Sequence, residues 1–257
     1  MAGNTVYIIT GANRGLGLGL TKSLLSRPST TIIATVRSDE AAASLKSETD
    51  SITAANKTTL YILKLDFSSA IPPEKIFEAF NMAAGAGTVS HVDVLICNAG
   101  STPPMTPSAA IKAEDLRAAF ETNTIAPLLV FQAFWPLLQK SPSKAPKVVM
   151  LTSSVGCMTL MEPVPGGAYG PSKAALNYLT KSLHVQHEAD ALVAIALHPG
   201  WVKTRAGEFV AKEWGFPGEP PVSVDDSVKG MLDVIDKATR ETVSGKLVTQ
   251  TGDVMPW

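Results

Sequence analysis

The sequence has few of the features that hold extracellular or membrane proteins together. Its 257 residues include only two cysteines, Cys97 and Cys157, which excludes a disulfide framework and predicts a reducing, cytoplasmic location. No apolar run approaches the roughly 20 residues of a membrane-spanning helix. The N-terminal stretch MAGNTVYIIT lacks the basic and apolar regions of a secretory signal. We therefore expect a cytoplasmic protein with no membrane partner.

The sequence also lacks an excess of charge of either sign. It has 22 lysine and arginine residues against 23 aspartate and glutamate residues, which gives a net charge of -1. This balance argues against a nucleic-acid partner that binds through bulk electrostatics. Histidine is scarce, with four residues. His184 and His187 are three positions apart, but no third ligand has zinc-like spacing, so we expect no metal site.

What the sequence does contain is a regular alternation of short apolar runs and longer amphipathic stretches. The runs are rich in Ile, Val and Leu without polar alternation, as in parallel strands covered on both faces. Strands are expected over residues 5–10, 30–36, 59–65, 92–97, 147–153, 192–198 and 245–250. Helices are expected over residues 15–27, 38–47, 72–84, 112–140, 168–188 and 223–238. This order predicts a single α/β domain over 1–257, with a Rossmann-type, doubly wound parallel sheet of about seven strands.

One long segment, residues 205–223, interrupts this alternation. Its sequence RAGEFVAKEWGFPGEPPVS is rich in Gly and Pro and carries Phe209, Trp214 and Phe216. Long loops inside compact domains are often lids or binding loops. The alternative is a plain surface connection before the last helix, but aromatic residues in an exposed loop favour a substrate lid.

The first expected strand leads directly into the turn TGANRGLG, residues 10–17, which has glycines at positions 11, 15 and 17. Glycines let the backbone come close to a ligand, and the N-terminus of the following helix offers free N–H groups to a pyrophosphate. A turn of this kind without a ligand is the alternative. The position at the first strand–helix junction favours a dinucleotide site.

The residues after the second expected strand indicate which dinucleotide binds. An Asp or Glu at this point usually holds the free ribose 2′-hydroxyl of NAD. Here Thr35 and Val36 occupy that place and Arg37 follows, while Arg14 lies in the glycine turn. Two guanidinium groups suit a 2′-phosphate, so we expect NADP(H). NAD stays open, because Asp39 and a neighbouring glutamate follow closely.

The sequence YGPSK places Tyr169 and Lys173 four residues apart, on one face of an expected helix. A phenol has a pKa of about 10 and is a slow acid at neutral pH. A lysine ammonium group one turn away is expected to lower that pKa. The pair then suits proton transfer in a ketone–alcohol interconversion.

Together these motifs resemble the short-chain dehydrogenase/reductase family, over essentially the whole chain. The matching residues are the glycine turn, Asp66 after the third strand, NAG at 98–100, Asn123 in ETNTIAP, Ser154, Tyr169 with Lys173, and HPGWVKT at 198–204. The resemblance implies that Tyr169 is the general acid and that Ser154 hydrogen-bonds the substrate carbonyl. It implies that Lys173 binds the nicotinamide ribose and assists Tyr169, and that Asn123 holds a water in a proton relay.

The same resemblance implies where the cofactor lies. Asp66 would face the adenine, Asn98 the adenosine ribose and the neighbouring strands, and Thr204 the pyrophosphate or the carboxamide. The full expected set of cofactor-binding residues is Gly11, Asn13, Arg14, Gly15, Leu16, Gly17, Arg37, Asp66, Asn98, Ala99, Gly100, Tyr169, Lys173, Pro199, Gly200, Val202 and Thr204.

The identity of the serine stays open between two neighbours. The strand end LTSSVG carries Ser153 and Ser154, and the segment from there to Tyr169 is slightly longer than the commonest family spacing. We prefer Ser154 because it directly precedes the VG that usually follows this serine in the family.

The C-terminal sequence SGKLVTQTGDVMPW is similar to a subgroup of C-factor-like proteins and of fungal ketoreductases of the type that acts on norsolorinic acid. This likeness implies reduction of a bulky apolar or aromatic ketone, such as a polyketide. The candidate pocket residues, which also suit an interface or the core, are Met158, Leu160, Met161, Phe209 and Trp214. A non-catalytic NADP(H)-binding sensor and an NAD-dependent alcohol dehydrogenase are the alternatives. The two long helices, 112–140 and 168–188, imply a homodimer or homotetramer.

Overall fold

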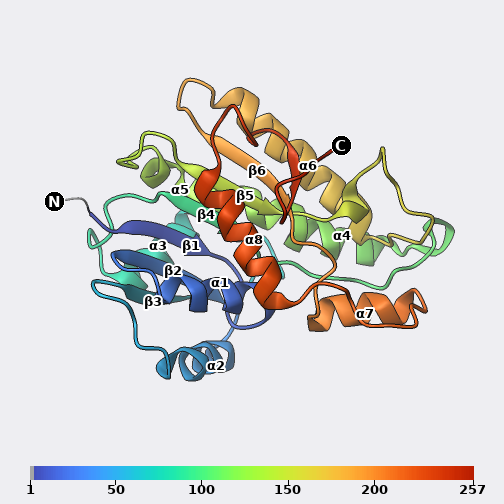
Figure 1. Cartoon of the computed structure of the whole chain (residues 1–257), viewed down its shortest axis with the longest axis horizontal. Coiled ribbons are helices and arrows are strands. Elements are labelled where there is room, and N and C mark those ends of the chain that lie inside the picture. The colour runs from blue at the N-terminus through green and yellow to red at the C-terminus, as the bar shows by residue number, and fades with distance from the viewer. Residues whose placement is uncertain (1–2) are drawn as a thin grey trace.

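The computed structural model describes residues 3–257 as one α/β unit around a single sheet (Figure 1). The strand order is β3-β2-β1-β4-β5-β6-β7-β8. Neighbouring strands pair in parallel from β3 to β7, and β8 is antiparallel to β7. The strands are β1 (Thr5–Ile9), β2 (Thr30–Val36), β3 (Thr59–Lys64), β4 (Val94–Cys97), β5 (Lys147–Leu151), β6 (Val193–His198), β7 (Leu247–Thr249) and β8 (Val254–Met255).

Helices cover both faces of this sheet. The helical elements are α1 (Gly15–Leu25), α2 (Asp39–Asp50), α3 (Pro73–Ala84), η1 (Ser108–Ala110), α4 (Ala113–Phe120), η2 (Glu121–Ile125), α5 (Ala126–Leu138), η3 (Ser154–Gly156), α6 (Tyr169–Gln186), α7 (Arg205–Glu213) and α8 (Val224–Lys237). One buried cluster joins the sheet to α1, α2 and α8, and another joins it to α3, α5 and α6. The doubly wound fold expected from the sequence is therefore confirmed.

The sheet is built from runs that are apolar on both sides. All seven residues of β2 are buried, and Ile32 and Ile33 point to opposite faces with no exposed surface. Burying one such side chain stabilises the fold by about 1.5–3 kcal/mol. Strands of this composition form only where helices cover both faces, which is why the sequence pattern identified them.

Three features differ from the elements expected from the sequence. The sheet has an eighth strand, β8, which is only two residues long. The expected helix 112–140 is interrupted by the π-helical turn η2 between α4 and α5. The expected loop 205–223 begins with the helix α7, whose N-cap Thr204 accepts a hydrogen bond from the backbone N–H of Gly207.

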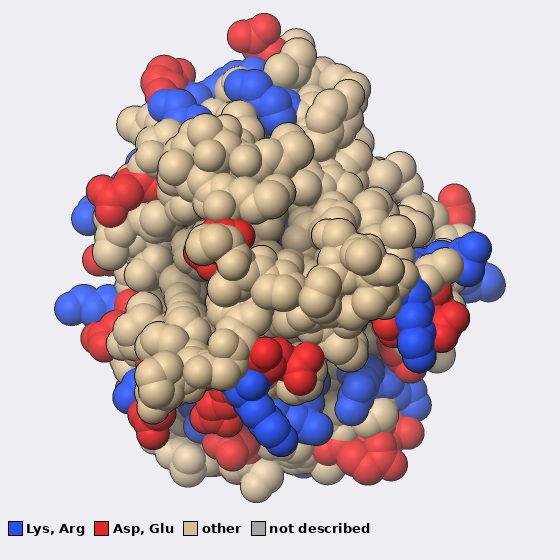
Figure 2. Space-filling model, turned by 90° about the vertical axis from the view of Figure 1, so that its right-hand side faces the viewer, with Lys and Arg blue, Asp and Glu red and all other residues tan. Residues whose placement is uncertain are grey.

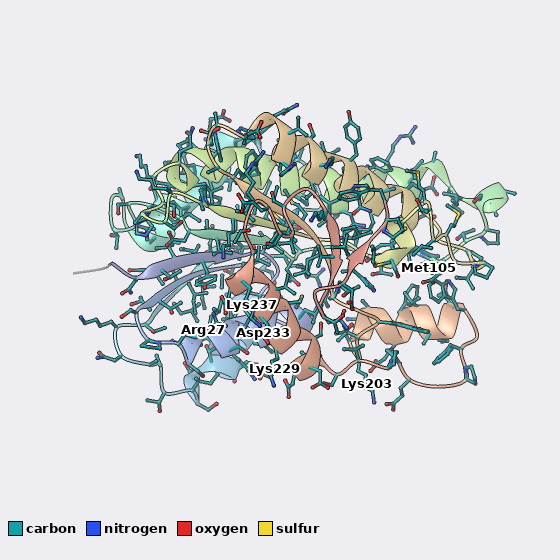
Figure 3. All side chains as sticks on the ribbon, turned by 45° about the horizontal axis from the view of Figure 1, so that its top comes forward. Arg27, Met105, Lys203, Lys229, Asp233 and Lys237 are labelled. Carbon is teal, nitrogen blue, oxygen red and sulfur yellow. The ribbon has the colours of Figure 1, made fainter. Side chains whose placement is uncertain are left out.

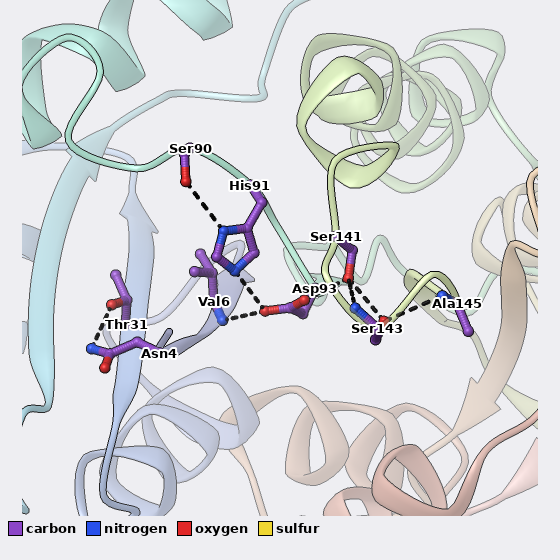
Figure 4. A network of polar contacts seen from close by, with 9 residues as sticks. All are labelled: Asn4, Val6, Thr31, Ser90, His91, Asp93, Ser141, Ser143 and Ala145. Carbon is purple, nitrogen blue, oxygen red and sulfur yellow. Dashed lines mark hydrogen bonds and ion pairs between the residues drawn. The ribbon is translucent and has the colours of Figure 1, made fainter. Parts of the chain in front are cut away.

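The amino-terminal edge of the sheet is fastened by a polar network around Asp93 (Figure 4). Its carboxylate accepts hydrogen bonds from the backbone N–H of Val6 at 2.8 Å and from the hydroxyl of Ser141. Nε2 of His91 lies 3.2 Å from Oδ2 of the same carboxylate. This network joins β1, the residue before β4 and the turn after α5, at the end of the sheet opposite the glycine turn and Tyr169. Among residues 3–257, no helix is long and apolar enough to cross a membrane.

Candidate active site

The residues singled out from the sequence gather at the carboxyl edge of the sheet, where strand order reverses between β1 and β4. Ligands of open α/β sheets bind at such a switch point. Figure 2 views the molecule from the side of α7. Uncharged residues cover the middle of this face, and most charged side chains lie around its rim.

The glycine turn follows β1 and leads into α1. Gly11 and Gly15 have φ angles of 69° and 53°, which side chains rarely adopt. A Cβ atom on Gly17 would collide with the carbonyl oxygen of Gly11. The side-chain amide of Asn98 donates hydrogen bonds to the carbonyl oxygens of Thr10 at 2.8 Å and Gly11 at 3.0 Å. The turn therefore presents backbone groups without side chains to a ligand, and Asn98, directly after β4, holds it in place.

The end of β2 lies against this turn. The backbone N–H groups of Gly11 and Ala12 donate to the side chain and the carbonyl oxygen of Thr35. Arg37 lies two residues beyond Thr35, and Arg14 lies two residues beyond Ala12 as the N-cap of α1. Both arginines are exposed, and among residues 3–257 neither takes part in an ion pair.

The acidic residues that kept NAD open are engaged elsewhere. Asp39 pairs with Lys64 at 2.9 Å. A hydrogen bond from the Ser38 side chain lowers the pKa of Glu40. Neither carboxylate is committed to the arginines, so the guanidinium groups remain available to a dianionic phosphate.

The other expected cofactor residues surround the turn. Asn13 and Leu16 are partly buried within it, and exposed Asp66 accepts a hydrogen bond from the backbone N–H of Ser68 after β3. Ala99 donates its backbone N–H to the Thr10 hydroxyl at 2.9 Å. A Cβ atom on Gly100 would lie 3.7 Å from the amino group of Lys173.

The turn after β6 lies against the glycine turn. Pro199 accepts a hydrogen bond from the Ser227 hydroxyl at 2.7 Å, and Gly200 has a φ angle of 82°. Val202 is buried and forms a parallel bridge with Val222. A Cβ atom on Gly15 would lie 3.5 Å from the Thr204 side chain, so this turn meets the glycine turn directly.

Asn123 lies in η2, the π-helical turn, and is fully buried. Its side chain accepts from the backbone N–H of Ser101 at 2.8 Å and donates to the Ser101 carbonyl and the Ser172 hydroxyl, both at 3.0 Å. These bonds tie the segment after β4 to α6. A π-helical turn shifts the pairing of backbone carbonyls, and such turns are frequent at functional sites.

Tyr169 and Lys173 begin α6, as the sequence predicted, and Pro171 lies in the first turn. The amino group of Lys173 lies 5.6 Å from the centroid of the Tyr169 ring. It donates a hydrogen bond to the Leu151 carbonyl oxygen at 2.7 Å. The two side chains therefore meet where β5 ends.

The expected direction of the tyrosine shift is wrong. Burial raises the pKa of Tyr169 to about 12, and the Ser153 hydroxyl opposes that shift as a hydrogen-bonding partner. Burial also lowers the pKa of Lys173 to about 8. Burial dominates both shifts because both groups are enclosed by protein, and neither group contributes to the pKa shift of the other. The phenol is therefore protonated at neutral pH.

The two serines at the end of β5 face different groups. Buried Ser153 lies beside Tyr169, and its oxygen accepts the backbone N–H of Val155 at 3.2 Å, which leaves the hydroxyl proton free to donate. The Ser154 hydroxyl is directed to Glu162 at 3.4 Å. This geometry favours Ser153 over Ser154, which was preferred from the sequence because of the residues that follow it.

Helix α7 and its following turn are fastened to the loops around the site. The indole N–H of Trp214 donates to the Pro165 carbonyl oxygen at 2.9 Å, and the backbone N–H of Met105 donates to Glu213 at 3.2 Å. The Trp201 ring packs edge-on against Trp214 and tilted against Phe216, with ring centroids 5.6 Å and 4.7 Å away. Met105 and Lys203 lie on either side of α7 in Figure 3.

The loop between η3 and α6 carries most of the apolar residues expected at the pocket. Met158, Leu160 and Met161 are exposed by 68%, 54% and 71%. Thr159 in the same loop donates its backbone N–H to the Trp257 carbonyl oxygen at 3.0 Å. This contact fastens the loop to the C-terminus, a link that no sequence motif indicated.

His198, at the end of β6, was expected from the sequence to line the cofactor pocket and to have no catalytic role. Its Nδ1 accepts the backbone N–H of Ser154 at 3.3 Å, and burial lowers its pKa to about 4. The imidazole is therefore neutral near pH 7, and its hydrogen bond with Ser154 joins the end of β6 to the turn that carries the two serines. Its position directly before Pro199 and Gly200 was the only available signal in the sequence.

Comparisons with known proteins agree with this arrangement. A sequence model described as short chain dehydrogenase matches residues 5–214. The chain is 38% identical to the short-chain dehydrogenase RED3 of Pyricularia oryzae, with 100% of both chains covered. It is 35% identical to the norsolorinic acid ketoreductase of Aspergillus parasiticus, over 98% of this chain and 91% of that protein.

Solved structures give the same picture. The NADPH-bound carbonyl reductase from chicken fatty liver superposes with a TM-score of 0.83 at 30% identity, and each chain is covered completely. The carbonyl reductase Sniffer of D. melanogaster superposes with a TM-score of 0.82 at 28% identity, again over both full chains.

Proposed function

Because the chain belongs to the short-chain dehydrogenase family, we propose that it is an NADPH-dependent carbonyl reductase that converts a ketone into an alcohol. The observation that carries this proposal is the grouping of Tyr169, Ser153 and Lys173 at the sheet edge, beside the glycine turn and the exposed side chains of Arg14 and Arg37. A hydroxyl pair of this kind polarises a carbonyl, and the turn suits a dinucleotide.

The residues present fit NADP(H). The backbone cradle of Gly11, Gly15 and Gly17 leaves room that side chains would fill, and the start of α1 offers N–H groups to a pyrophosphate. Arg14 and Arg37 would hold the 2′-phosphate through charge-assisted hydrogen bonds. The NADPH-bound chicken enzyme, at 30% identity, supports this choice.

In the proposed reaction, the substrate carbonyl oxygen accepts hydrogen bonds from Tyr169 and Ser153. NADPH, when bound, supplies the hydride that reduces the carbonyl carbon. Negative charge then develops on the oxygen, where the two hydroxyls stabilise it. Tyr169 transfers its phenolic proton to this oxygen, because an alkoxide is far more basic than a phenolate. The raised pKa keeps the proton on Tyr169 until that moment.

Lys173 and Asn123 support the proton transfer. With a pKa of about 8, Lys173 is about nine-tenths protonated at pH 7, and its charge stabilises the phenolate that Tyr169 becomes. Both N–H groups and the oxygen of the Asn123 side chain are engaged in hydrogen bonds with Ser101 and Ser172. We therefore place any relay water at a backbone carbonyl of the π-helical turn and assign the Asn123 side chain to positioning.

We propose that the substrate is a bulky apolar or aromatic ketone, such as a secondary-metabolite polyketide. Support comes from the exposed side chains of Met158, Leu160 and Met161 and from the aromatic group of Trp201, Trp214 and Phe216. Exposed apolar residues beside a reactive centre usually serve binding. The norsolorinic acid ketoreductases among the relatives have names that fit such a substrate.

The proposal is tested by following NADPH and NADH oxidation with a series of aryl ketones of increasing size and with small aliphatic ketones. We expect NADPH to be used with a kcat/KM at least tenfold above that of NADH, and large aryl ketones to be preferred. Absence of ketone-dependent oxidation of either cofactor throughout the series would contradict it.

A further inference from the structure

His198 is a neutral imidazole with one of its two nitrogens already occupied. Nδ1 accepts the backbone N–H of Ser154 at 3.3 Å. A nitrogen that accepts a hydrogen bond carries no proton, so in the neutral ring the proton resides on Nε2. Ser154 thereby fixes His198 as a hydrogen-bond donor through Nε2.

The Nε2 proton has no acceptor among residues 3–257. The fully buried side-chain nitrogens and oxygens without a hydrogen bond are Nε2 of His91 and Oε1 of Glu121. Nε2 of His198 is not among them, so this nitrogen reaches the accessible surface. The hydrogen bond at Nδ1 orients the ring. The N–H group at Nε2 has no partner in the described part of the chain and is available to a ligand.

The side of the sheet on which His198 lies follows from strand alternation. Residues 194, 196 and 198 of β6 point to one face. Ala194 packs in the cluster that contains Leu176 of α6, and Ala196 packs with Cys157 of the loop after η3. His198 therefore lies on the α6 face, at the carboxyl edge, next to the turn that carries Ser153.

We propose that His198 determines substrate specificity by donating its Nε2–H to a second oxygen of the substrate, next to the carbonyl that is reduced. This inference rests on the proposed reductase activity. The ligand class is an aryl ketone with an acceptor oxygen at the ortho position or a 1,3-dicarbonyl compound. Ketones without this oxygen bind through Tyr169 and Ser153 alone.

Two variants distinguish the acceptor role of Nδ1 from the donor role of Nε2. His198→Asn keeps an acceptor near the Nδ1 position for the Ser154 N–H and removes the donor at Nε2. His198→Gln extends an amide N–H toward the Nε2 position and keeps a donor. The probes are two isomers of a methoxy-substituted aryl ketone, one ortho and one para, which differ only in where the second oxygen lies.

We expect His198→Asn to lower the ratio of kcat/KM for the ortho isomer to that for the para isomer about threefold to tenfold, the loss of one neutral hydrogen bond. The para value should stay within about twofold, and His198→Gln should keep the wild-type ratio. Comparing ratios cancels the steric difference between the isomers.

An unchanged ratio in His198→Asn, or an equal loss for both isomers, would overturn the inference and leave only a structural role. If the wild-type protein reduces no ketone, neither these isomers nor the aryl and aliphatic series, the proposed function fails instead. Calorimetric titration of the two ketones into the NADPH-loaded wild type and His198→Asn then tests the inference by itself. Ortho binding weakened threefold to tenfold supports it, and equal changes overturn it.

Discussion

The amino group of Lys173 lies 5.6 Å from the centre of the Tyr169 ring while it donates a hydrogen bond to the Leu151 carbonyl oxygen. One turn of α6 separates the two residues, and the carbonyl at the end of β5 fixes the ammonium group beside the phenol. The lysine is 4% exposed, so its charge is held in a confined position. This relationship links the sheet edge to the proposed proton transfer.

The first prediction concerns pH. The pKa of Lys173 is lowered to about 8 by burial, so its charge is lost as the pH rises through 8, and kcat/KM for reduction should fall above that value. Between about 8 and 10.5 the unfolded chain binds more protons at this site than the folded one, so this group makes stability rise with pH in that window. Lys173→Met should lower kcat/KM by about 10²–10⁴. It should also remove the fall of kcat/KM above pH 8 and the rise of stability between about pH 8 and 10.5.

The measurements are a pH–rate profile from 6 to 10 and thermal melting over the same range. Lys181→Met, on the exposed side of the same helix, is the matched control and should keep both slopes. A wild-type profile that stays level through pH 9.5 would contradict the requirement for a charged lysine.

The second prediction distinguishes the two adjacent serines. Ser153→Ala removes the hydroxyl that faces Tyr169 and should lower kcat by about 10²–10³, as loss of one donor to a developing oxyanion does. Ser154→Ala removes only a hydroxyl directed to Glu162 and should change kcat less than about threefold. Steady-state kinetics with a saturating ketone decide the matter, and the reverse order would restore Ser154.

The third prediction concerns the cofactor. Arg37→Asp removes a cation next to the glycine turn and should raise KM for NADPH about tenfold to a hundredfold, because a charge-assisted hydrogen bond contributes about 1.5–3 kcal/mol. KM for NADH should stay level or fall. Arg14→Asp should act in the same direction. Lys140→Asp, at an exposed position after α5, is the control, and similar KM changes for both cofactors in Arg37→Asp would remove the selector role.

The fourth prediction concerns the segment that starts with α7. Trp214→Phe keeps an aromatic ring against Trp201 but removes the hydrogen bond to the Pro165 carbonyl. We expect KM for a bulky aryl ketone to rise about threefold to tenfold while kcat with a small ketone stays within twofold. Trp135→Phe is the control, because the Trp135 ring packs tilted against His187 with the ring centroids 4.3 Å apart. Equal effects on large and small ketones would argue that the segment is no substrate lid.

The sequence predicted those parts of the fold that depend on local apolar pattern. The runs of β1, β2 and β5 are buried on both faces and could be recognised as such. Helix α7 was missed because the Gly and Pro residues that follow it dominate the composition of 205–223, although Thr204 caps a helix there. Strand β8 is too short to leave a pattern and forms only because β7 lies beside it.

The sequence predicted which residue types form the site, but it did not predict the direction of the Tyr169 pKa shift. The spacing of Tyr169 and Lys173 fixed their common helix face, as the structure has it. The direction of the Tyr169 pKa depends on burial by loops distant in sequence, which spacing does not reveal. The choice between Ser153 and Ser154 depends on where one strand ends and η3 begins, and a shift of one residue reverses the direction of the side chain.

The central claim is that the Tyr169 phenol donates its proton to the reduced carbonyl, and Tyr169→Phe tests it most directly. The substitution removes one oxygen and keeps the ring, so NADPH should bind with a Kd within about twofold of wild type. The ketone-dependent rate of NADPH oxidation, followed by absorbance in single turnover, should fall by at least about 10². A rate within threefold of wild type, with NADPH still bound, would contradict the account.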